Sequence, residues 1–381
     1  MGSANKTICI YYNFGETLTG SDNTMLSLIG ALKELSFVNI ILITNQKNKI
    51  TDSISSEKVK VFYFNKVLSG DYKISKGINL LFNSLSFFNK IRKLKDSYNV
   101  DLFLVRSIFS VFVIFPSSYL FGIEYIWDIG FERKIIFDRN IKLSLLKRSR
   151  AVVCQYPSQV NDIFSQDIPE KYSDKIKAFV PGLSTNRSIE EITKQDRISS
   201  YTDVIKILCV AYIYPRKNQL EVLKIINSIG DDTFQAHFLG HVISKGYYQK
   251  LKNYVAANTL EKQVFFHGRS ENVFSYMRNS HLLIIPSYDE GLPNVLREGM
   301  YAGNGVIASN NGGMKDFVKN YETGLIYKNG HISRVLNFLR EVNKDRDKLS
   351  DIRDKAERSA LSSFNNKKWS KSYKELVSNN L

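Results

Sequence analysis

Two glutamates, Glu290 and Glu298, are separated by seven residues and flank the expected start of a helix, within residues 287–300. A helix start offers backbone N–H groups and the positive end of the helix dipole, which together suit an anion such as a phosphate. Two acids beside such a site form a pattern that suits many phosphoryl ligands. Each acid also has a plainer interpretation, Glu290 as a loop acid and Glu298 as a solvent-facing helix residue.

The residues around the two acids predict the elements that position them. The hydrophobic run at residues 281–286 predicts a buried strand that leads into the turn. A short helix is expected from Pro293 to about Tyr301, and Gly303 would end it. Proline suits the first helical position because its missing N–H would have been unpaired there anyway. We therefore predict a strand, a turn and a helix start in succession.

The first half of the chain alternates between strand and helix patterns. Residues 7–12, 39–44 and 59–64 are apolar runs typical of buried strands, and residues 24–35 have helical periodicity. This alternation predicts a parallel, doubly wound α/β sheet. Ligands bind such sheets at the carboxyl edge, where residues 13–23 would form a glycine-containing loop. Further strands are expected at residues 101–105, 125–130, 151–155 and 177–182.

A second alternating unit begins at residue 205. Its strands are expected at residues 205–211, 236–240, 264–268, 281–286 and 305–309, with helices from residue 219 and over residues 246–257 and 273–279. With 381 residues, the chain is long enough for two domains. We expect an N-terminal acceptor-binding domain over residues 1–190, a linker over 191–204, a C-terminal domain over 205–365, and a final helix over 366–381 that packs back on the first domain.

Composition sets limits on the class of protein. Hydrophobic residues make up 43% of the chain and aromatic residues 12%, so a disordered chain is excluded. Three cysteines, Cys9, Cys154 and Cys209, stand alone in apolar runs, without metal or redox spacing. They predict buried free thiols in a reducing compartment. Residues 1–6 lead straight into a strand and do not resemble a signal peptide.

The net charge is +16, from 53 basic and 37 acidic residues, and favours anionic partners. Residues 73–95 hold six cations and no anion, and residues 133–150 hold seven cations against Asp138. The helix expected at residues 78–95 is either a packed helix with a solvated basic end or a membrane-surface helix. Residues 108–123 are apolar but too short for a membrane span, and predict a buried helix. Charge alone does not support nucleic-acid binding.

Residues 264–327 resemble the nucleotide-sugar half of family-4 retaining glycosyltransferases of the GT-B fold, also described as glycosyl transferases group 1. The resemblance is carried by the two glutamates in the form E-G-L-P-N-V-x-x-E. It is supported by Pro286-Ser287, Ala302-Gly303, Asn311-Gly312-Gly313 and Thr323-Gly324-Leu325. The rest of the chain is similar in topology only. The resemblance implies an α/β protein with two Rossmann-like doubly wound domains that face each other across a cleft.

The resemblance also implies roles for the residues of the motif. Glu298 would accept the ribose hydroxyls, and Glu290 would be the catalytic residue that holds the donor sugar, since a carboxylate can orient a vicinal diol. Lys217, with Arg216 beside it, would bind the diphosphate, although Lys217 as a surface residue is the alternative. Tyr212 stands where the family has an arginine. The donor would also contact the helix start, at Gly291, Leu292, Pro293, Asn294 and Val295.

Four further residues receive weaker assignments from the resemblance. Gly20 and Ser21 match the family's glycine loop in part, and would approach the donor phosphate. His267 would end a strand near the base pocket, or be a packing histidine. Asp128 would be a catalytic-site contact to the acceptor, or a strand-end cap. No D-x-D-like motif occurs within residues 264–327, so neither a metal nor another cofactor is expected.

The resulting hypothesis is a bacterial retaining hexosyltransferase at the cytoplasmic face of the membrane, bound peripherally to its anionic surface. It would move a sugar from a UDP-sugar to a glycan or lipid-linked acceptor, in the synthesis of a surface polysaccharide such as lipopolysaccharide. One alternative is a catalytically silent GT-B subunit that binds a nucleotide or a partner enzyme. Another is a sugar-nucleotide epimerase of the same fold.

Overall fold

A computed structural model of the chain describes residues 5–14, 20–64, 75–130, 139–164, 168–183 and 196–381. The chain divides into two compact units. Unit 1 is residues 1–184 with residues 366–381, and unit 2 is residues 185–365. Of the expected linker, residues 191–195 lie outside the described residues, and residues 196–204 belong to unit 2.

Unit 1 is built on a parallel sheet whose strands have the order β3-β2-β1-β4-β5-β6-β7 within the described residues. Because side chains alternate along a strand, Ile8 and Ile10 face one side of the sheet while Cys9 and Tyr11 face the other. Both faces are therefore buried, as in other parallel sheets. The strands are β1 (Lys6–Tyr11), β2 (Val38–Thr44), β3 (Val59–Tyr63), β4 (Val100–Arg106), β5 (Glu124–Asp128), β6 (Ser149–Cys154) and β7 (Ile176–Ala178).

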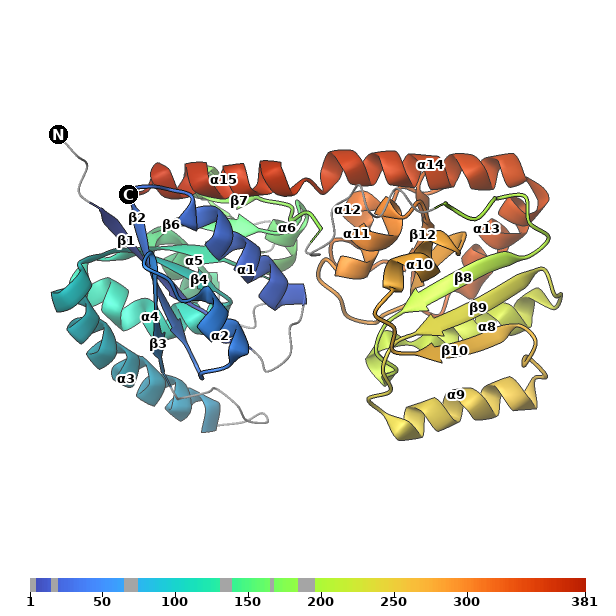
Figure 1. Ribbon diagram of the computed structural model, residues 1–381, viewed down its shortest axis with the longest axis horizontal. Helices are drawn as coiled ribbons and strands as arrows, with labels where there is room; N and C mark the ends of the chain where they lie inside the picture. The colour runs from blue at the N-terminus through green and yellow to red at the C-terminus, as the bar shows by residue number, and fades with distance from the viewer. Residues whose placement is uncertain (1–4, 15–19, 65–74, 131–138, 165–167, 184–195) are drawn as a thin grey trace. The chain divides into compact units, whose positions relative to one another are not determined.

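Helices cover both faces of this sheet (Figure 1). One face packs against α1 (Gly20–Lys33), α2 (Lys49–Ile54) and the C-terminal helix α15 (Asn366–Ser378). The other face packs against α3 (Ser75–Tyr98), α4 (Ile108–Phe121), α5 (Arg139–Arg148) and α6 (Gln159–Phe164). A 3-10 helix, Glu170–Lys175, precedes β7. The last helix of the chain therefore belongs to the first unit, where Trp369, Tyr373 and Val377 enter the core beside α1.

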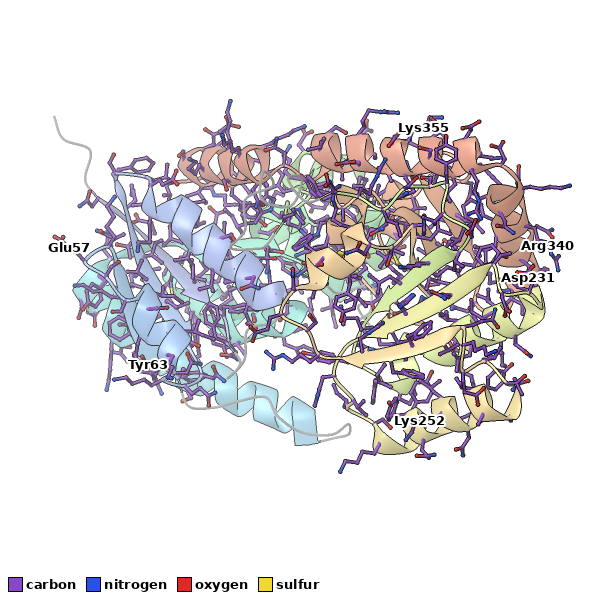
Figure 2. All side chains as sticks on the ribbon, turned by 45° about the vertical axis from the view of Figure 1, so that its right-hand side comes forward. Glu57, Tyr63, Asp231, Lys252, Arg340 and Lys355 are labelled. Atoms are coloured by element: carbon purple, nitrogen blue, oxygen red, sulfur yellow. The ribbon has the colours of Figure 1, made fainter. Side chains whose placement is uncertain are left out.

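Unit 2 repeats the arrangement with the strand order β10-β9-β8-β11-β12-β13. Exposed charged residues such as Lys252 and Arg340 lie on its outer helices (Figure 2). Its strands are β8 (Ile205–Val210), β9 (Phe234–Leu239), β10 (Val264–Gly268), β11 (Leu282–Ile285), β12 (Gly305–Ser309) and β13 (Gly324–Tyr327). Its helices are the 3-10 helix η2 (Pro215–Lys217), α8 (Gln219–Ile229), α9 (Lys245–Ala257), α10 (Val273–Arg278), α11 (Asn294–Tyr301), α12 (Met314–Phe317), α13 (Ile332–Lys344) and α14 (Arg346–Ser363).

The predicted α/β fold of two doubly wound units is confirmed, with two local corrections. Gly20 and Ser21 form the first turn of α1, not part of a loop. Asp22 lies in the first turn of this helix, where an acidic side chain complements the helix dipole. Pro293 is the residue before α11 and has an extended backbone, with φ of −68° and ψ of 139°, so it is not the first helical residue. Its carbonyl already accepts a hydrogen bond from the Leu296 N–H at 3.2 Å.

The expectations for the cysteines and the apolar helix can also be compared with the structure. All three cysteines are buried free thiols, and burial raises the pKa of each, so they stay protonated at neutral pH. Residues 108–121 form the helix α4, which packs in unit 1. Among the described helices, none is both long enough and apolar enough to cross a membrane.

Candidate functional site

In both sheets the strand order reverses beside the first strand, and such a reversal is where doubly wound sheets bind ligands. In unit 2 the reversal falls between β8 and β11, which are neighbours. Lys217 lies in the connection that follows β8, and Glu290 lies in the turn that follows β11. Strand order therefore brings together two predicted site residues that are 73 positions apart in sequence.

Lys217 and Glu290 form an ion pair. Their side chains are 19% and 13% exposed, so the pair is shielded but can be reached by a ligand. The neighbouring Arg216 lies 3.9 Å from Asp289, and both of these side chains are more than half exposed. An exposed pair of that kind contributes little to stability. Lys217 is therefore the cation that the fold holds in place, while the Arg216 side chain is exposed and its backbone carbonyl accepts from the Tyr288 N–H.

The turn that carries Glu290 is held by the loop Asn311-Gly312-Gly313. The Gly313 N–H donates to the Gly291 carbonyl at 2.8 Å, and the Asn311 amide donates to the Ser287 carbonyl at 3.0 Å. Gly312 has φ of +55°, and a Cβ there would lie 2.1 Å from the Glu290 carbonyl oxygen. Only glycine permits this approach. The glycine pattern noted in the sequence therefore has a physical role, which is to set the position of the Glu290 turn.

A buried carboxylate that the sequence analysis missed, Glu221, supports the same turn. It accepts hydrogen bonds from the Asn218 amide at 3.1 Å and from the Gly330 N–H at 2.9 Å. The amides of Asn218 and Asn329 both donate to the Pro286 carbonyl, at 3.2 and 2.7 Å. Glu221 thus orients the Asn218 amide, which holds the Pro286 carbonyl at the end of β11. Its sequence signal is an acid in the first turn of α8, four residues after Lys217.

The helix α11 presents Glu298 close to the same sheet edge. The helix approaches β11 closely because residue 299 is glycine: a Cβ there would lie 2.5 Å from Leu283 Cδ2. Gly303, with φ of +75°, follows its last turn as predicted. Desolvation raises the pKa of the Glu298 carboxyl group, and the neighbouring Arg297 guanidinium opposes that shift. Glu298 is therefore not the fully solvated helix residue of the plainer interpretation.

The predicted donor contacts at the helix start lie in one continuous stretch of backbone. Gly291 and Leu292 are buried, while Pro293, Asn294 and Val295 are half-buried. The first N–H groups of a helix have no partner within the helix, and α11 has no side-chain cap at its start. This stretch can therefore direct backbone donors at an anion, as the sequence predicts. No cluster of three or more potential metal ligands occurs among the residues that the structure describes.

His267 lies in a row of aromatic rings on β9 and β10. Its ring stacks on His237 with a centroid distance of 5.3 Å, and His237 Nδ1 lies 3.0 Å from His267 Nε2. The Tyr276 ring also packs against the His267 ring, with a centroid distance of 4.9 Å. Desolvation lowers the pKa of both imidazoles, that of His237 to about 4, so they are neutral at pH 7. These contacts favour the packing interpretation, although the exposed ring could still contact a base.

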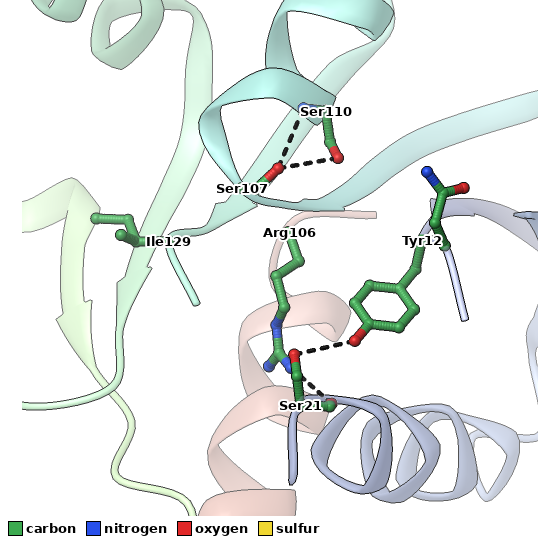
Figure 3. A pocket seen from close by; sticks show the side chains of 7 residues that line it. Tyr12, Ser21, Arg106, Ser107, Ser110 and Ile129 are labelled. Atoms are coloured by element: carbon green, nitrogen blue, oxygen red, sulfur yellow. Dashed lines mark hydrogen bonds between the residues drawn. The ribbon is translucent and has the colours of Figure 1, made fainter. Parts of the chain in front are cut away.

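In unit 1 the strand order reverses between β1 and β4, where the structure has a cavity of about 400 Å³ lined mainly by residues with polar groups (Figure 3). Of the residues assigned by resemblance, the cavity contains Ser21. It also contains Arg106, which the sequence analysis did not select although it directly follows the strand predicted at residues 101–105. The lining residues are Tyr12, Asn13, Ser21, Arg106, Ser107, Ser110 and Ile129.

Asp128 is fully buried behind this cavity. Its Oδ2 accepts from Arg106 Nη2 at 2.6 Å, from Arg106 Nε at 3.0 Å and from the Tyr373 hydroxyl at 3.0 Å. Its Oδ1 accepts from the Gly130 N–H at 2.9 Å. A carboxylate with four donors and no exposed surface is not free to bind an acceptor. The geometry therefore favours the other interpretation of Asp128, a cap at the end of β5.

Residues 190–359 match the family model described as Glycosyl transferases group 1. An uncharacterized glycosyltransferase of Haemophilus influenzae is 33% identical over 92 residues, which are 24% of this chain and 26% of that protein. The uncharacterized glycosyltransferase MJ1178 of Methanocaldococcus jannaschii is 32% identical over 103 residues, 27% of this chain and 28% of that protein. The matched region thus spans little more than a quarter of each relative.

Solved structures match the chain over almost its whole length. A glycosyltransferase from Rickettsia africae has a TM-score of 0.74 at 16% identity, covering 98% of this chain and 99% of that one. Anabaena HepE in complex with UDP has a TM-score of 0.73 at 14% identity, covering 98% and 100%. The lipopolysaccharide outer core galactosyltransferase WaaB has a TM-score of 0.73 at 13% identity, also covering 98% and 100%. Residues 190–359 therefore match a glycosyl transferases group 1 domain, and the chain has the GT-B fold.

Proposed function

We propose that this protein is a retaining glycosyltransferase that moves a hexose from a UDP-sugar to a glycan or lipid-linked acceptor of a bacterial surface polysaccharide. The observation that carries the proposal is the Lys217–Glu290 pair at the strand reversal of unit 2, with Glu298 on the adjoining helix. The group 1 domain supports the activity. The UDP complex of HepE supports the donor, and the name of WaaB supports the acceptor class.

The charges of the site suit a nucleoside diphosphate. A diphosphate competes with Glu290 for the Lys217 ammonium group, and the first turn of α11 adds backbone donors for it. Once displaced from Lys217, the Glu290 carboxylate can accept hydroxyl hydrogen bonds from the donor sugar. Glu298 accepts the ribose hydroxyls. Lysine and helix amides together offset the charge of the leaving group, so the proposed chemistry requires no metal.

The reaction exchanges one bond for another at the anomeric carbon. The bond from that carbon to the phosphate oxygen breaks, and a bond to the acceptor oxygen forms on the same face of the sugar. The acceptor's proton passes to the departing phosphate, and UDP leaves. Glu290 orients the sugar and does not attack it, so the scheme differs from hydrolysis by a pair of carboxylates.

A thermal-shift panel of nucleotide sugars tests this proposal. We expect a UDP-sugar to raise the Tm most, and the protein then to hydrolyse that donor slowly in the absence of an acceptor. A Glu290→Ala, Glu298→Ala double variant should lose both effects. Full activity of the double variant would exclude this site as the donor site.

A catalytically silent subunit is the second candidate, and Tyr212 favours it. The tyrosine side chain is exposed beside η2, where related proteins are expected to carry a cation. Such a subunit would bind UDP-sugar with a measurable isotherm and transfer no sugar to any extract. If the donor is instead converted to an epimer without an acceptor, product analysis will identify an epimerase.

We also propose that the protein acts at the cytoplasmic face of the membrane, on an anionic surface. Tyr119 and Leu120 are each 65% exposed at the end of α4. Arg148 lies over the Tyr119 ring at 5.0 Å, and Lys95 lies over the Phe121 ring at 4.9 Å. Apolar groups flanked by cations suit an anionic interface.

A flotation experiment with phosphatidylglycerol vesicles tests this proposal. The protein should float with the vesicles, and a Tyr119→Ser, Leu120→Ser variant should float less. Absence of binding at low salt would exclude this partner.

A further inference from the structure

The C-terminal helix α15 carries a tyrosine that reaches the carboxyl edge of the unit 1 sheet, at the end of β5. Tyr373 is buried, and its hydroxyl donates to Asp128 Oδ2 at 3.0 Å. Its ring is held edge-on by Phe179 at 5.1 Å and by Trp369 at 5.0 Å. Packing therefore fixes the direction of the hydroxyl, which is the only polar group of this side chain.

Asp128, which the Tyr373 hydroxyl helps to hold, in turn orients the Arg106 guanidinium. The same Oδ2 atom accepts from Nε and Nη2 of Arg106, and a guanidinium is a rigid fork, so both contacts together set its plane. Gly130 allows the close packing, since a Cβ there would lie 3.0 Å from Arg106 Cγ. The orientation of Arg106 thus depends on a carboxylate that Tyr373 helps to hold.

Arg106 in turn shapes the cavity at the strand reversal. Its Nη1 lies 3.3 Å from the Ser21 carbonyl at the start of α1, and the Tyr12 hydroxyl lies 2.9 Å from Ser21 Oγ (Figure 3). Three of the five guanidinium N–H groups make the contacts with Asp128 and Ser21. Arg106 lines the cavity, where its guanidinium can donate to a ligand.

The lining of the cavity suits a ligand rich in hydroxyl groups. Hydroxyls of Tyr12, Ser21, Ser107 and Ser110 and the amide of Asn13 can both donate and accept. The Arg106 charge is matched by Asp128, and Asp22 lies 3.0 Å from the Tyr12 hydroxyl, so no net positive charge is left for an anion. A sugar ring fits this chemistry better than a phosphate does.

We propose that Tyr373 is a positioning residue for a sugar acceptor in this cavity, acting through Asp128 and Arg106. The assignment rests on the proposed function, since it names the acceptor side of the same reaction. Loss of the Tyr373 hydroxyl leaves Oδ2 of Asp128 with one fewer donor, so the carboxylate that orients the Arg106 fork is held less firmly. Acceptor binding weakens, while donor binding in unit 2 does not change.

The test compares Tyr373→Phe with Tyr125→Phe. Tyr125 is a matched control, because it is equally buried in unit 1 and its hydroxyl donates to the Leu145 carbonyl at 2.6 Å, outside the cavity lining. With UDP-glucose as donor probe and octyl β-glucoside as acceptor probe, Tyr373→Phe should raise the acceptor KM about tenfold and leave the donor KM unchanged. Tyr125→Phe should change neither KM. An Arg106→Lys variant, which keeps the charge but loses the fork, should reproduce the acceptor effect.

A second readout does not depend on activity. Phenylglyoxal should modify Arg106 several-fold faster in Tyr373→Phe than in Tyr125→Phe or in the protein without substitutions. Peptide mass spectrometry measures the rate. Equal Arg106 reactivity in the two variants would overturn the positioning role, and so would equal acceptor KM values. If the unmodified protein transfers no sugar from any donor, the proposed function fails, while the reactivity of Arg106 still decides whether Tyr373 positions it.

Discussion

Each unit has an ion pair at its strand reversal, and the two pairs differ in exposure. The Arg106 and Asp128 side chains of unit 1 are 4% and 0% exposed, and the carboxylate has four donors. The Lys217 and Glu290 side chains of unit 2 are 19% and 13% exposed, and the contact joins one cation to one carboxylate. The same topology thus carries a structural pair in one unit and an exchangeable pair in the other.

Desolvation explains why the two pairs have different roles. Charges that are fully removed from water must keep all their partners, because an unpaired buried charge is very costly. A partly solvated pair can open at a small cost, since water and ligands replace the lost contact. The proposed diphosphate could therefore separate Lys217 from Glu290, whereas all four donors to Asp128 are needed to compensate its burial.

The largest expected effect is on stability, in the variant Asp128→Asn. The amide leaves the Arg106 charge without its counterion, and we expect the unfolding free energy of unit 1 to fall by about 3–5 kcal/mol. Glu290→Gln should cost less than about 1 kcal/mol. Urea denaturation followed by hydrogen exchange in each unit measures both. If the two variants are equally destabilising, exposure does not separate the pairs.

Glu290→Gln should instead affect function, in two opposite directions. UDP should bind several-fold more tightly by calorimetry, because no carboxylate competes for Lys217. Sugar transfer should fall about 100-fold, because the donor sugar loses the group that orients it. Asp289→Asn is the matched control, since it removes the same charge from the exposed neighbour of Glu290. Weaker UDP binding by Glu290→Gln would contradict the exchange of partners at Lys217.

Gly312→Ala tests how closely the Glu290 turn must be held. The added Cβ would lie 2.1 Å from the Glu290 carbonyl oxygen, so the turn must shift. We expect about a tenfold loss of transfer. Gly230→Ala is the control, because Gly230 also has a positive φ of +77° but open space around the new Cβ. That variant should lose some stability by denaturation and keep its transfer rate, so equal losses of transfer would argue against a positional effect.

The smallest effect is the pH dependence that Glu298 adds to stability. Its pKa is raised in the folded protein, so folding favours the protonated form, and stability falls as pH rises through that pKa. Glu298→Gln lacks this fall. Its Tm should therefore exceed that of the unmodified protein at pH 7, and the difference should vanish below pH of about 4. Glu261→Gln, at an exposed glutamate, is the control, and a Tm difference of the same size in that variant would contradict the role given to Glu298.

Local patterns predicted much of the fold and part of the site. The strands at residues 264–268 and 305–309 and the start of α8 at Gln219 agree with the structure, because buried strands and amphipathic helices have distinct periodicities. The strand β13 was not predicted. It has four residues, one of them glycine, so its sequence carries little strand pattern.

Sequence alone determined the features that local chemistry encodes: the doubly wound units, the E-x7-E motif, the glycines around it and the basic charge. Tertiary structure decided which charges meet. Lys217 and Glu290 are 73 positions apart, and Tyr373 and Asp128 are 245 positions apart. Strand order and helix packing create these contacts. The residue spacing within a single segment predicts neither the strand order nor the helix packing. Burial then made one pair structural and left the other open to exchange, because desolvation depends on everything that packs around a charge.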